Sequence, residues 1–251
     1  MRYIPIEKTE QDMILARSVY DNTGRVLLSC GTVLTDEYID KLYDRGLPGI
    51  YIEDKLAEDI EIEEAISEEL RNEGAEALRN GDVDAAMGVG RRIVDEIIQN
   101  PRVTLDLIDL RSYDDYTYRH SVNVAVISTV IGINMQLNRL ALDELSIAAI
   151  LHDIGKRRID PKIINKKGKL TPEEYTEVKH HSEYGYEMVK SRIDLSAKIK
   201  NAILLHHENE DGSGYPKGLK GNQIFIYAKI IHVADVFDAL TAKRPYKKAY
   251  A

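Results

Sequence analysis

The sequence predicts a mainly α-helical protein, in which an all-helical domain follows a small α+β module. Three observations support this fold class. Apolar residues recur at helical spacing through the second half of the chain. Short apolar runs between turn-forming residues mark its start. An acidic stretch that also keeps helical spacing separates the two regions. We therefore expect an α+β module at residues 1–53, a helical connector at 54–100 and a helical domain at 101–251.

The first module is predicted from short apolar segments and one amphipathic helix. Met13–Ala16 and Arg25–Leu28 are typical of strands, and the turn-forming residues Asp21–Gly24 lie between them. Thr35 is expected to begin the helix, and Gly49–Ile52 is a further predicted strand. This region has no catalytic constellation, so a structural or regulatory role is favoured. A ligand sensor is the alternative, and no residue here identifies its ligand.

The connector is acidic and helical, with a break at Gly81 before a second helix at Val83–Ile98. Its glutamates could be mistaken for a metal or acid–base site. A run of like charges is more typical of a solvated helix face, and we adopt that interpretation. The same helices are candidates for pairing with a second copy of the chain, which would make a homodimer.

Composition excludes several classes of protein. The chain has 251 residues, a net charge of -8 and a pI of about 5.5, which argues against general nucleic-acid binding. The single cysteine, Cys30, excludes a cysteine-based zinc site. With no signal peptide, it also favours a reducing cytoplasm. No apolar run approaches the ~20 residues that a membrane span needs.

Helical spacing indicates which histidines point inward. His152 continues an apolar stripe through Leu145, and Gly155 is the expected C-terminal cap of that helix. A second helix is predicted to begin at Thr171, the first residue of a capping box. On that helix His181 shares the apolar face, whereas neighbouring His180 shares a face with glutamates. We therefore expect His181 to be a ligand and His180 to be solvated.

The same test finds further polar residues on apolar faces. The inward set is His120, His152, Asp153, His181, His206, His207 and Asp235. A single inward histidine is usually a core residue, but so many buried imidazoles would be costly without a partner. Imidazole and carboxylate suit iron, manganese or zinc. The set therefore predicts a nitrogen-and-oxygen site for two divalent cations.

Several motifs resemble one known family. They are Tyr116–Ser121, His152–Lys156, His206–Glu208, Asp211–Pro216, Asp235–Thr241 and Arg244–Tyr246. Together, and in this order, they resemble the HD-GYP signature over about residues 101–251. That family consists of bacterial phosphodiesterases of cyclic di-GMP, which use a two- or three-metal centre, often of iron or manganese, in an all-helical fold.

The resemblance implies a division of the ligands between two cations. The first would be held by His120, His152, Asp153 and Asp235, and the second by Asp153, His181, His206 and His207. Asp153 would bridge them. Three-metal members of the family carry a glutamate one helical turn before His120, where this chain has Tyr116. We therefore expect two metals, iron or manganese.

Three basic residues are candidate substrate contacts. Lys156 lies one helical turn after His152, where its ammonium could bind a phosphate and stabilise the transition state. Alternatively, Lys156 is only a cation favoured at a helix C-terminus. Arg244 and Lys247 are candidate phosphate clamps. Gly212–Pro216 is expected to form a loop that serves substrate or a signalling partner.

The resemblance implies a cytoplasmic enzyme of bacterial signalling that hydrolyses cyclic di-GMP to linear pGpG and, more slowly, to GMP. Two alternatives stay open: a phosphohydrolase acting on another nucleotide, and a non-catalytic receptor for cyclic dinucleotides. Because the family normally continues with further helices after Ala251, we also expect the chain to be truncated.

Overall fold

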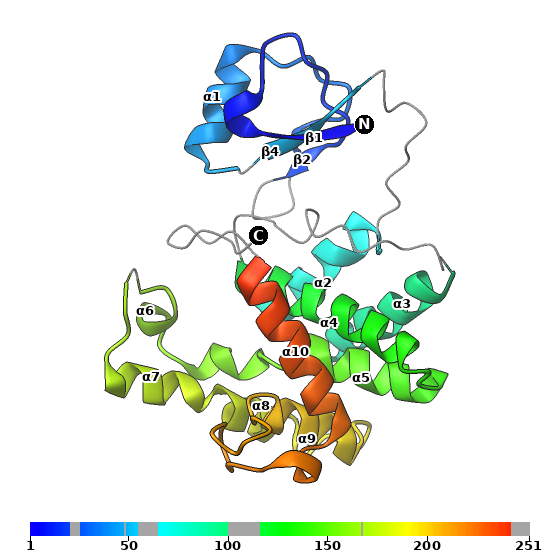
Figure 1. Ribbon diagram of the computed structural model, residues 1–251, viewed down its shortest axis with the longest axis vertical. Helices are drawn as coiled ribbons and strands as arrows, with labels where there is room; N and C mark the ends of the chain where they lie inside the picture. Colours follow the sequence, from blue (N-terminus) through cyan, green and yellow to red (C-terminus); the bar gives the residue numbers. More distant parts are fainter. Residues whose placement is uncertain (21–25, 48, 55–64, 100–115, 167, 242–251) are drawn as a thin grey trace. The chain divides into compact units, whose positions relative to one another are not determined.

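The computed structural model describes residues 1–20, 26–47, 49–54, 65–99, 116–166 and 168–241 (Figure 1). The chain divides into two compact units. Of the described residues, those before 55 belong to the first unit, and almost all of those from 65 to 240 belong to the second. The mainly helical fold class is confirmed, with the strands confined to the first unit among the described residues.

The first unit is a small α+β module. Strand β1 (Arg2–Pro5) pairs antiparallel with β4 (Gly49–Ile52), and β2 (Val19–Tyr20) pairs with β3 (Val26–Leu28). Between them lie the 3-10 helix η1 (Ile6–Lys8) and helix α1 (Asp36–Asp44). Thr35 caps α1, as predicted, by accepting a hydrogen bond from a backbone amide.

One strand prediction in this module is wrong. Met13–Ala16 forms only two isolated bridges, in which Ile14 meets Val33 and Leu15 meets Ile52. The reason is tertiary, because Leu15 is fully buried in the core of the module and its segment crosses between two partners. The predicted turn at Asp21–Gly24 lies outside the described residues.

The second unit begins with four long helices: α2 (Glu68–Asn80), α3 (Val83–Gln99), α4 (Tyr116–Asn134) and α5 (Arg139–Leu151). Ser67 caps α2, and Gly81 ends it in a left-handed conformation (φ 72°), so the predicted break is confirmed. Gly74 permits the close approach of these helices, since a Cβ there would lie 2.8 Å from a methyl of Val122 on α4.

The remaining elements are shorter until the last helix. They are η3 (Ile154–Arg158), α6 (Pro161–Ile164), α7 (Pro172–Lys179), α8 (His181–Val189), α9 (Ala197–Leu205), η4 (Gly221–Gln223) and α10 (Ile226–Thr241). The capping box of Thr171 and Glu174 is present at the start of α7. The helix predicted to carry both His180 and His181 is interrupted at His180, which is the C-terminal cap of α7 and directly precedes α8.

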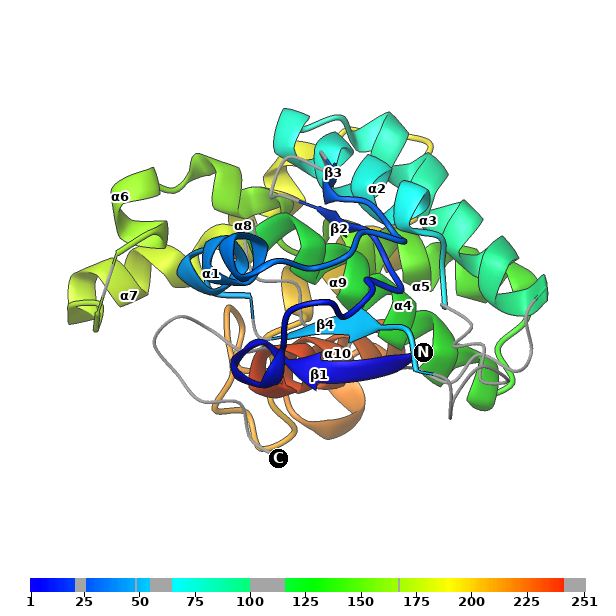
Figure 2. The same cartoon turned by 90° about the horizontal axis from the view of Figure 1, so that it is seen from above.

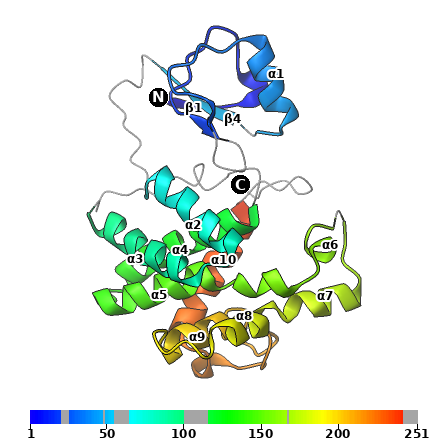
Figure 3. The ribbon, with the colours of Figure 1, turned by 180° about the vertical axis from the view of Figure 1, so that it is seen from behind.

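Helix α5 lies at the centre of this unit. It packs against α3 and α9, and α8 packs against η3 and α9. The buried residues of α5 include Leu145, Ala148 and Ala149, which form the stripe predicted to precede His152. Figure 2 shows α2 and α3 on one side of α4 and α5, with α10 on the other, and Figure 3 shows the same helices from behind. The core therefore lies between three layers of helices.

Among the described residues, no helix is both long enough and apolar enough to cross a membrane.

Candidate metal centre

Helix ends hold three of the predicted ligands. His152 follows α5, His206 follows α9, and His181 begins α8 directly after the end of α7. Each imidazole bonds through Nδ1 to the backbone carbonyl three residues earlier. The carbonyls are those of Ala149 (2.7 Å), Val178 (2.6 Å) and Ile203 (2.8 Å). Because a carbonyl only accepts, Nδ1 is the donor in each ring, and the lone pair is on Nε2.

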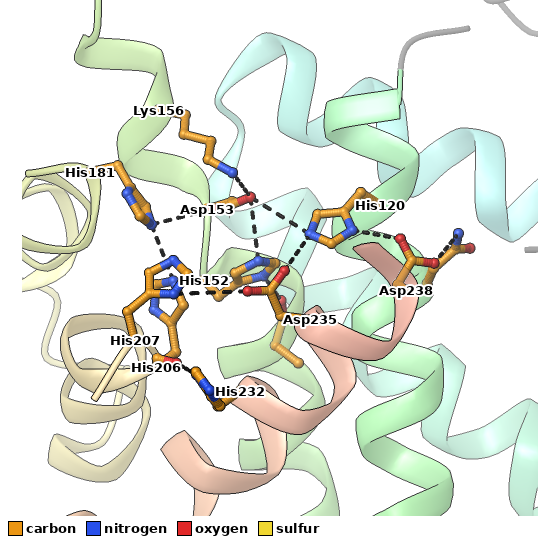
Figure 4. A network of polar contacts seen from close by, with 12 residues as sticks. His120, His152, Asp153, Lys156, His181, His206, His207, His232, Asp235 and Asp238 are labelled. Carbon is orange, nitrogen blue, oxygen red and sulfur yellow. Dashed lines mark hydrogen bonds and ion pairs between the residues drawn. The ribbon is translucent and has the colours of Figure 1, made fainter. Parts of the chain in front are cut away.

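The polar side chains that the sequence placed inward gather at one place in the second unit (Figure 4). Two groups have their potential ligand atoms within 4.8 Å of one another: His181, His206 and His207 in the first, and His120, His152 and Asp153 in the second. Nε2 of His181 lies 3.2 Å from Nε2 of His206. Such a spacing suits atoms that share a cation.

Asp153 lies between the two groups and faces both of them. Its Oδ1 lies 3.3 Å from Nε2 of His181. Its Oδ2 lies 3.4 Å from Nε2 of His152 and 3.9 Å from Nε2 of His120. Lys156 also contacts Oδ2. One carboxylate thus presents a different oxygen to each group of histidines, which is the arrangement that a bridging ligand requires.

Asp235 of α10 closes the opposite side of the site. Its Oδ1 lies 3.0 Å from Nε2 of His120, and its Oδ2 lies 3.9 Å from Nδ1 of His207. The resemblance assigned Asp235 only to the cation held by His120, His152 and Asp153. In the structure its two oxygens face one histidine from each group.

Burial keeps three of the histidines neutral. It lowers the pKa of His181 to about 4 and that of His207 to about 3, and it holds the pKa of His206 well below 6.5. Metal binding requires the neutral imidazole, so these rings are ready ligands near pH 7.

His120 differs from these three histidines. Burial alone would lower its pKa, but hydrogen bonds with Asp235 and Asp238 raise it to about 9. Burial alone would raise the pKa of Asp153, yet its interactions with His152 and with the ammonium of Lys156 outweigh burial and hold that pKa well below its usual range. The carboxylate of Asp153 therefore stays ionised.

Two buried polar atoms show that this site fits cations. Nε2 of His152 and Oδ1 of Asp153 are both buried and have no hydrogen-bond partner. A buried polar atom without a partner costs about 1–3 kcal/mol. Both atoms carry lone pairs and lie beside further imidazole nitrogens. A divalent cation would satisfy them, and the nitrogen-and-oxygen donor set suits iron or manganese.

The other predicted site residues are placed differently. The side chain of His180 is 46% exposed and bonds through Nδ1 to Glu183 at 2.7 Å, outside the gathering of ligands. Arg244 and Lys247 lie outside the described residues. Tyr116 begins α4, and its side chain also lies outside them.

Gly155 does not have the predicted role. It has no left-handed conformation and lies within η3, so it is not a C-terminal cap. A Cβ at this position would lie 1.9 Å from the carbonyl oxygen of His181 and 2.4 Å from the nitrogen of Gly185. Glycine is therefore needed for the close approach of η3 to α8, which brings Asp153 to His181.

The segment that directly follows the Gly212–Pro216 loop is anchored by a buried carboxylate. Glu208, which is 3% exposed, accepts hydrogen bonds from the backbone amides of Lys217 (2.6 Å) and Leu219 (2.8 Å). The ring of Tyr215 stacks on His207, with centroids 4.7 Å apart. This loop therefore lies against one of the candidate ligands.

Sequence reasoning missed Asp238. It is fully buried on α10, and its Oδ2 lies 2.6 Å from Nδ1 of His120. Its spacing of three residues from Asp235 was a usable signal, because such residues share a helix face. His232 of the same helix bonds through Nδ1 to the backbone carbonyl of His206 at 2.8 Å.

Comparisons with known proteins agree with this arrangement. The family model described as HD domain matches residues 102–251. A protein named cyclic di-GMP phosphodiesterase from Pseudomonas aeruginosa is 40% identical over 162 residues, which cover 63% of this chain and 39% of that protein. A protein of the same name from Thermotoga maritima is 41% identical over 149 residues, covering 57% of this chain and 40% of that one. The chain thus matches about two fifths of the length of these relatives.

The fold is also found in a solved structure, that of a HDG"Y"P protein from Bdellovibrio bacteriovorus. It has a TM-score of 0.60 and 19% sequence identity, and covers 98% of this chain and 90% of that one. This likeness extends over both units and supports the fold. The family model, which matches more than half of the chain, shows that the chain belongs to the HD domain family, within the HD-GYP group that its motifs resemble.

Proposed function

We propose that this chain is a metal-dependent phosphodiesterase that hydrolyses cyclic di-GMP to linear pGpG. The observation that carries the proposal is the position of Asp153, whose two oxygens face different groups of histidines. Relatives at 40% and 41% identity named cyclic di-GMP phosphodiesterase support the choice of substrate.

The proposed cofactors are two divalent cations, iron or manganese. The residues that would hold them are His120, His152, Asp153 and Asp235 for one, and Asp153, His181, His206 and His207 for the other. When bound, the cations supply positive charge that activates water and neutralises the phosphodiester.

The chain's own residues hold and orient these groups. The carbonyls behind His152, His181 and His206 fix each ring so that Nε2 faces the centre. Lys156, with its side chain 27% exposed, places its ammonium beside Asp153 and can contact a phosphate oxygen there. A cation that is only favoured at a helix C-terminus would need no ion pair with Asp153. The observed ion pair therefore favours a role of Lys156 in the site. Arg244 and Lys247 are proposed as further phosphate contacts.

A second substrate is favoured by a particular relative. A protein of Vibrio cholerae named 3'3'-cGAMP-specific phosphodiesterase 3 is 37% identical over 143 residues. Both cyclic dinucleotides present the same phosphodiester ring to a metal centre, so the geometry of the candidate ligands suits either one. Residues that contact the bases would decide between them.

The experiment is a substrate panel with the Mn²⁺- or Fe²⁺-loaded protein. Cyclic di-GMP, 3'3'-cGAMP and linear pGpG are incubated separately, and products are resolved by chromatography. We expect pGpG from cyclic di-GMP, little activity for Asp153→Asn, and unchanged activity for the control His180→Gln. Preference for 3'3'-cGAMP would support the second substrate. Binding of a cyclic dinucleotide without turnover by the metal-loaded protein would contradict an enzyme and support a receptor.

We further propose that the second cut to GMP is much slower than the first. Linear pGpG carries a terminal phosphate with additional negative charge, and its desolvation is costly without a third cation. Tyr116, in place of a third-metal ligand, supports two metals per chain. Metal analysis with a time course tests this, and three metals per chain or GMP without a pGpG lag would contradict it.

We also propose a cytoplasmic location, a structural or regulatory role for residues 1–53, homodimerisation through the connector and a signalling partner at Gly212–Pro216. The acidic helices of the connector support the proposed dimer, and the position of Tyr215 beside His207 supports a partner at the loop.

A further inference from the structure

A buried chain of polar side chains leads from α2 to the candidate metal centre. Nη1 of Arg71 donates to Oδ1 of Asn123 at 2.8 Å. Nδ2 of Asn123 donates to Oδ1 of Asp238 at 3.1 Å. Oδ2 of Asp238 lies 2.6 Å from Nδ1 of His120. All four side chains are buried, and they come from three helices: α2, α4 and α10.

The direction of each hydrogen bond in this series of side chains is fixed. A guanidinium only donates and an ionised carboxylate only accepts, so the Asn123 amide satisfies both neighbours in one orientation alone. Asp238 then accepts from Asn123 and from Nδ1 of His120. Nε2 of His120 is left to face Asp153 and Asp235. Figure 4 shows His120 between Asp238 on one side and these two aspartates on the other.

We propose that Arg71 is a positioning residue for the cation held by His120, His152 and Asp153. This inference rests on the proposed metal function. Arg71 acts by fixing the orientation of the Asn123 amide, which holds Asp238 and, through it, the His120 ring. The helix that the sequence presents as a connector therefore supplies part of the support of the centre.

The hydrogen bonds from Arg71 end at His120, which belongs to only one of the two histidine groups. His181, His206 and His207 are held by backbone carbonyls or by the Tyr215 ring, and none of them contacts Asp238. Loss of the Arg71 donor would leave the buried oxygen of Asn123 without that hydrogen bond and would remove one of the two contacts that fix the orientation of the amide. The effect on metal affinity should therefore be selective for one cation.

Arg119 provides a matched control at the same helix contact. It runs in the opposite direction, from α4 to α2, where it donates to Glu68 at 2.9 Å and to Asn72 at 2.5 Å. Arg119 is 9% exposed and Arg71 is 3% exposed, so both are buried arginines of one interface. Both arginines contact Glu68, at 3.5 Å for Arg71 and 2.9 Å for Arg119, and the described contacts of Arg71 also lead through Asn123 to Asp238.

The test is Mn²⁺ binding to the metal-free full chain, compared among wild type, Arg71→Gln and Arg119→Gln. Calorimetric titration gives the affinity of each cation, and electron paramagnetic resonance distinguishes a coupled Mn²⁺ pair from a single ion. We expect Arg71→Gln to weaken one cation by about 10–100-fold and to leave the other unchanged. The spectrum should then change from a coupled pair to a single ion at limiting Mn²⁺. Arg119→Gln should lower the melting temperature while retaining both cations.

Two further variants separate positioning from general stability. Arg71→Lys keeps a donor and should recover part of the lost affinity. In a double-mutant cycle, Asn123→Leu combined with Arg71→Gln should lose little more affinity than the larger single change, because both act through one path. If Arg71→Gln fails to fold, full wild-type affinity in the Arg71→Lys and Asn123→Leu variants overturns the proposal.

The outcomes also distinguish this inference from the proposed function. Equal weakening of both cations by Arg71→Gln and Arg119→Gln, or two cations of wild-type affinity in Arg71→Gln, contradicts the role of Arg71 alone. A wild-type chain that takes up no Mn²⁺ contradicts the metal centre itself and the inference with it.

Discussion

Replacing Gly155 with alanine should damage the site without changing any candidate ligand. The added Cβ would lie 1.9 Å from the carbonyl oxygen of His181 and 2.4 Å from the nitrogen of Gly185. Non-bonded atoms of this kind keep about 3 Å or more apart, so η3 and α8 must separate by about 1 Å. Both obstacles are backbone atoms, which cannot rotate away as a side chain can.

The expected cost has two parts. Overpacking of this kind destabilises a protein by about 1–3 kcal/mol. In addition, the separation moves Asp153 away from His181, whose Oδ1 and Nε2 are now 3.3 Å apart. A displacement of about 1 Å in a catalytic arrangement can lower the rate by about 100-fold. We therefore expect a modest loss of stability and a much larger loss of activity and metal affinity.

The assay combines urea unfolding, Mn²⁺ titration and hydrolysis of cyclic di-GMP. Gly88→Ala in α3 is the matched control, because a Cβ there meets nothing within 4 Å. It should be neutral or stabilising by up to about 1 kcal/mol, since alanine favours a helix over glycine. If Gly155→Ala keeps wild-type metal affinity and activity, the close approach of η3 and α8 does not set the position of His181.

Three further predictions follow from the same contacts. The metal-free protein should lose stability as pH falls from 6.5 towards 5, because the pKa values of His181 and His207 are lowered to about 4 and about 3 and the unfolded chain binds more protons. The expected slope is about 1.4 kcal/mol per pH unit for each histidine, and pH-independent unfolding by urea would contradict it. Asp153→Ala should release both cations and abolish hydrolysis, whereas retention of two metals would rule out a bridging role. Glu208→Gln should speed hydrogen exchange at the backbone amides of Lys217 and Leu219, and unchanged protection would show that the carboxylate does not anchor this segment.

Local signals made much of the second unit predictable. The capping box at Thr171 and the break at Gly81 depend on residues within one helical turn, so their sequence spacing is sufficient. Helical periodicity also distinguished buried His181 from half-exposed His180, although the helix is interrupted between them. A one-residue step turns a side chain by about 100°, which separates neighbours whatever their partners are.

Weaker local signals failed where packing competed with them. Met13–Ala16 has strand composition, yet Leu15 is drawn into the core and leaves only isolated bridges. Gly155 was predicted to cap a helix, whereas glycine is required there because the backbone of α8 leaves no room for a Cβ. In both cases the deciding atom belongs to a segment distant in the sequence. A single sequence contains no information on which distant segments come into contact.

The sequence by itself determined which side chains point inward and which chemistry they can perform. Only the tertiary structure decided how they are divided, with one oxygen of Asp153 facing each group of histidines. The support behind His120 was equally beyond the sequence, because Arg71 and Asn123 lie 52 positions apart and Asn123 and Asp238 lie 115 positions apart. Periodicity fixes the face of a helix, whereas the partner on that face is chosen by the packing of whole helices against one another.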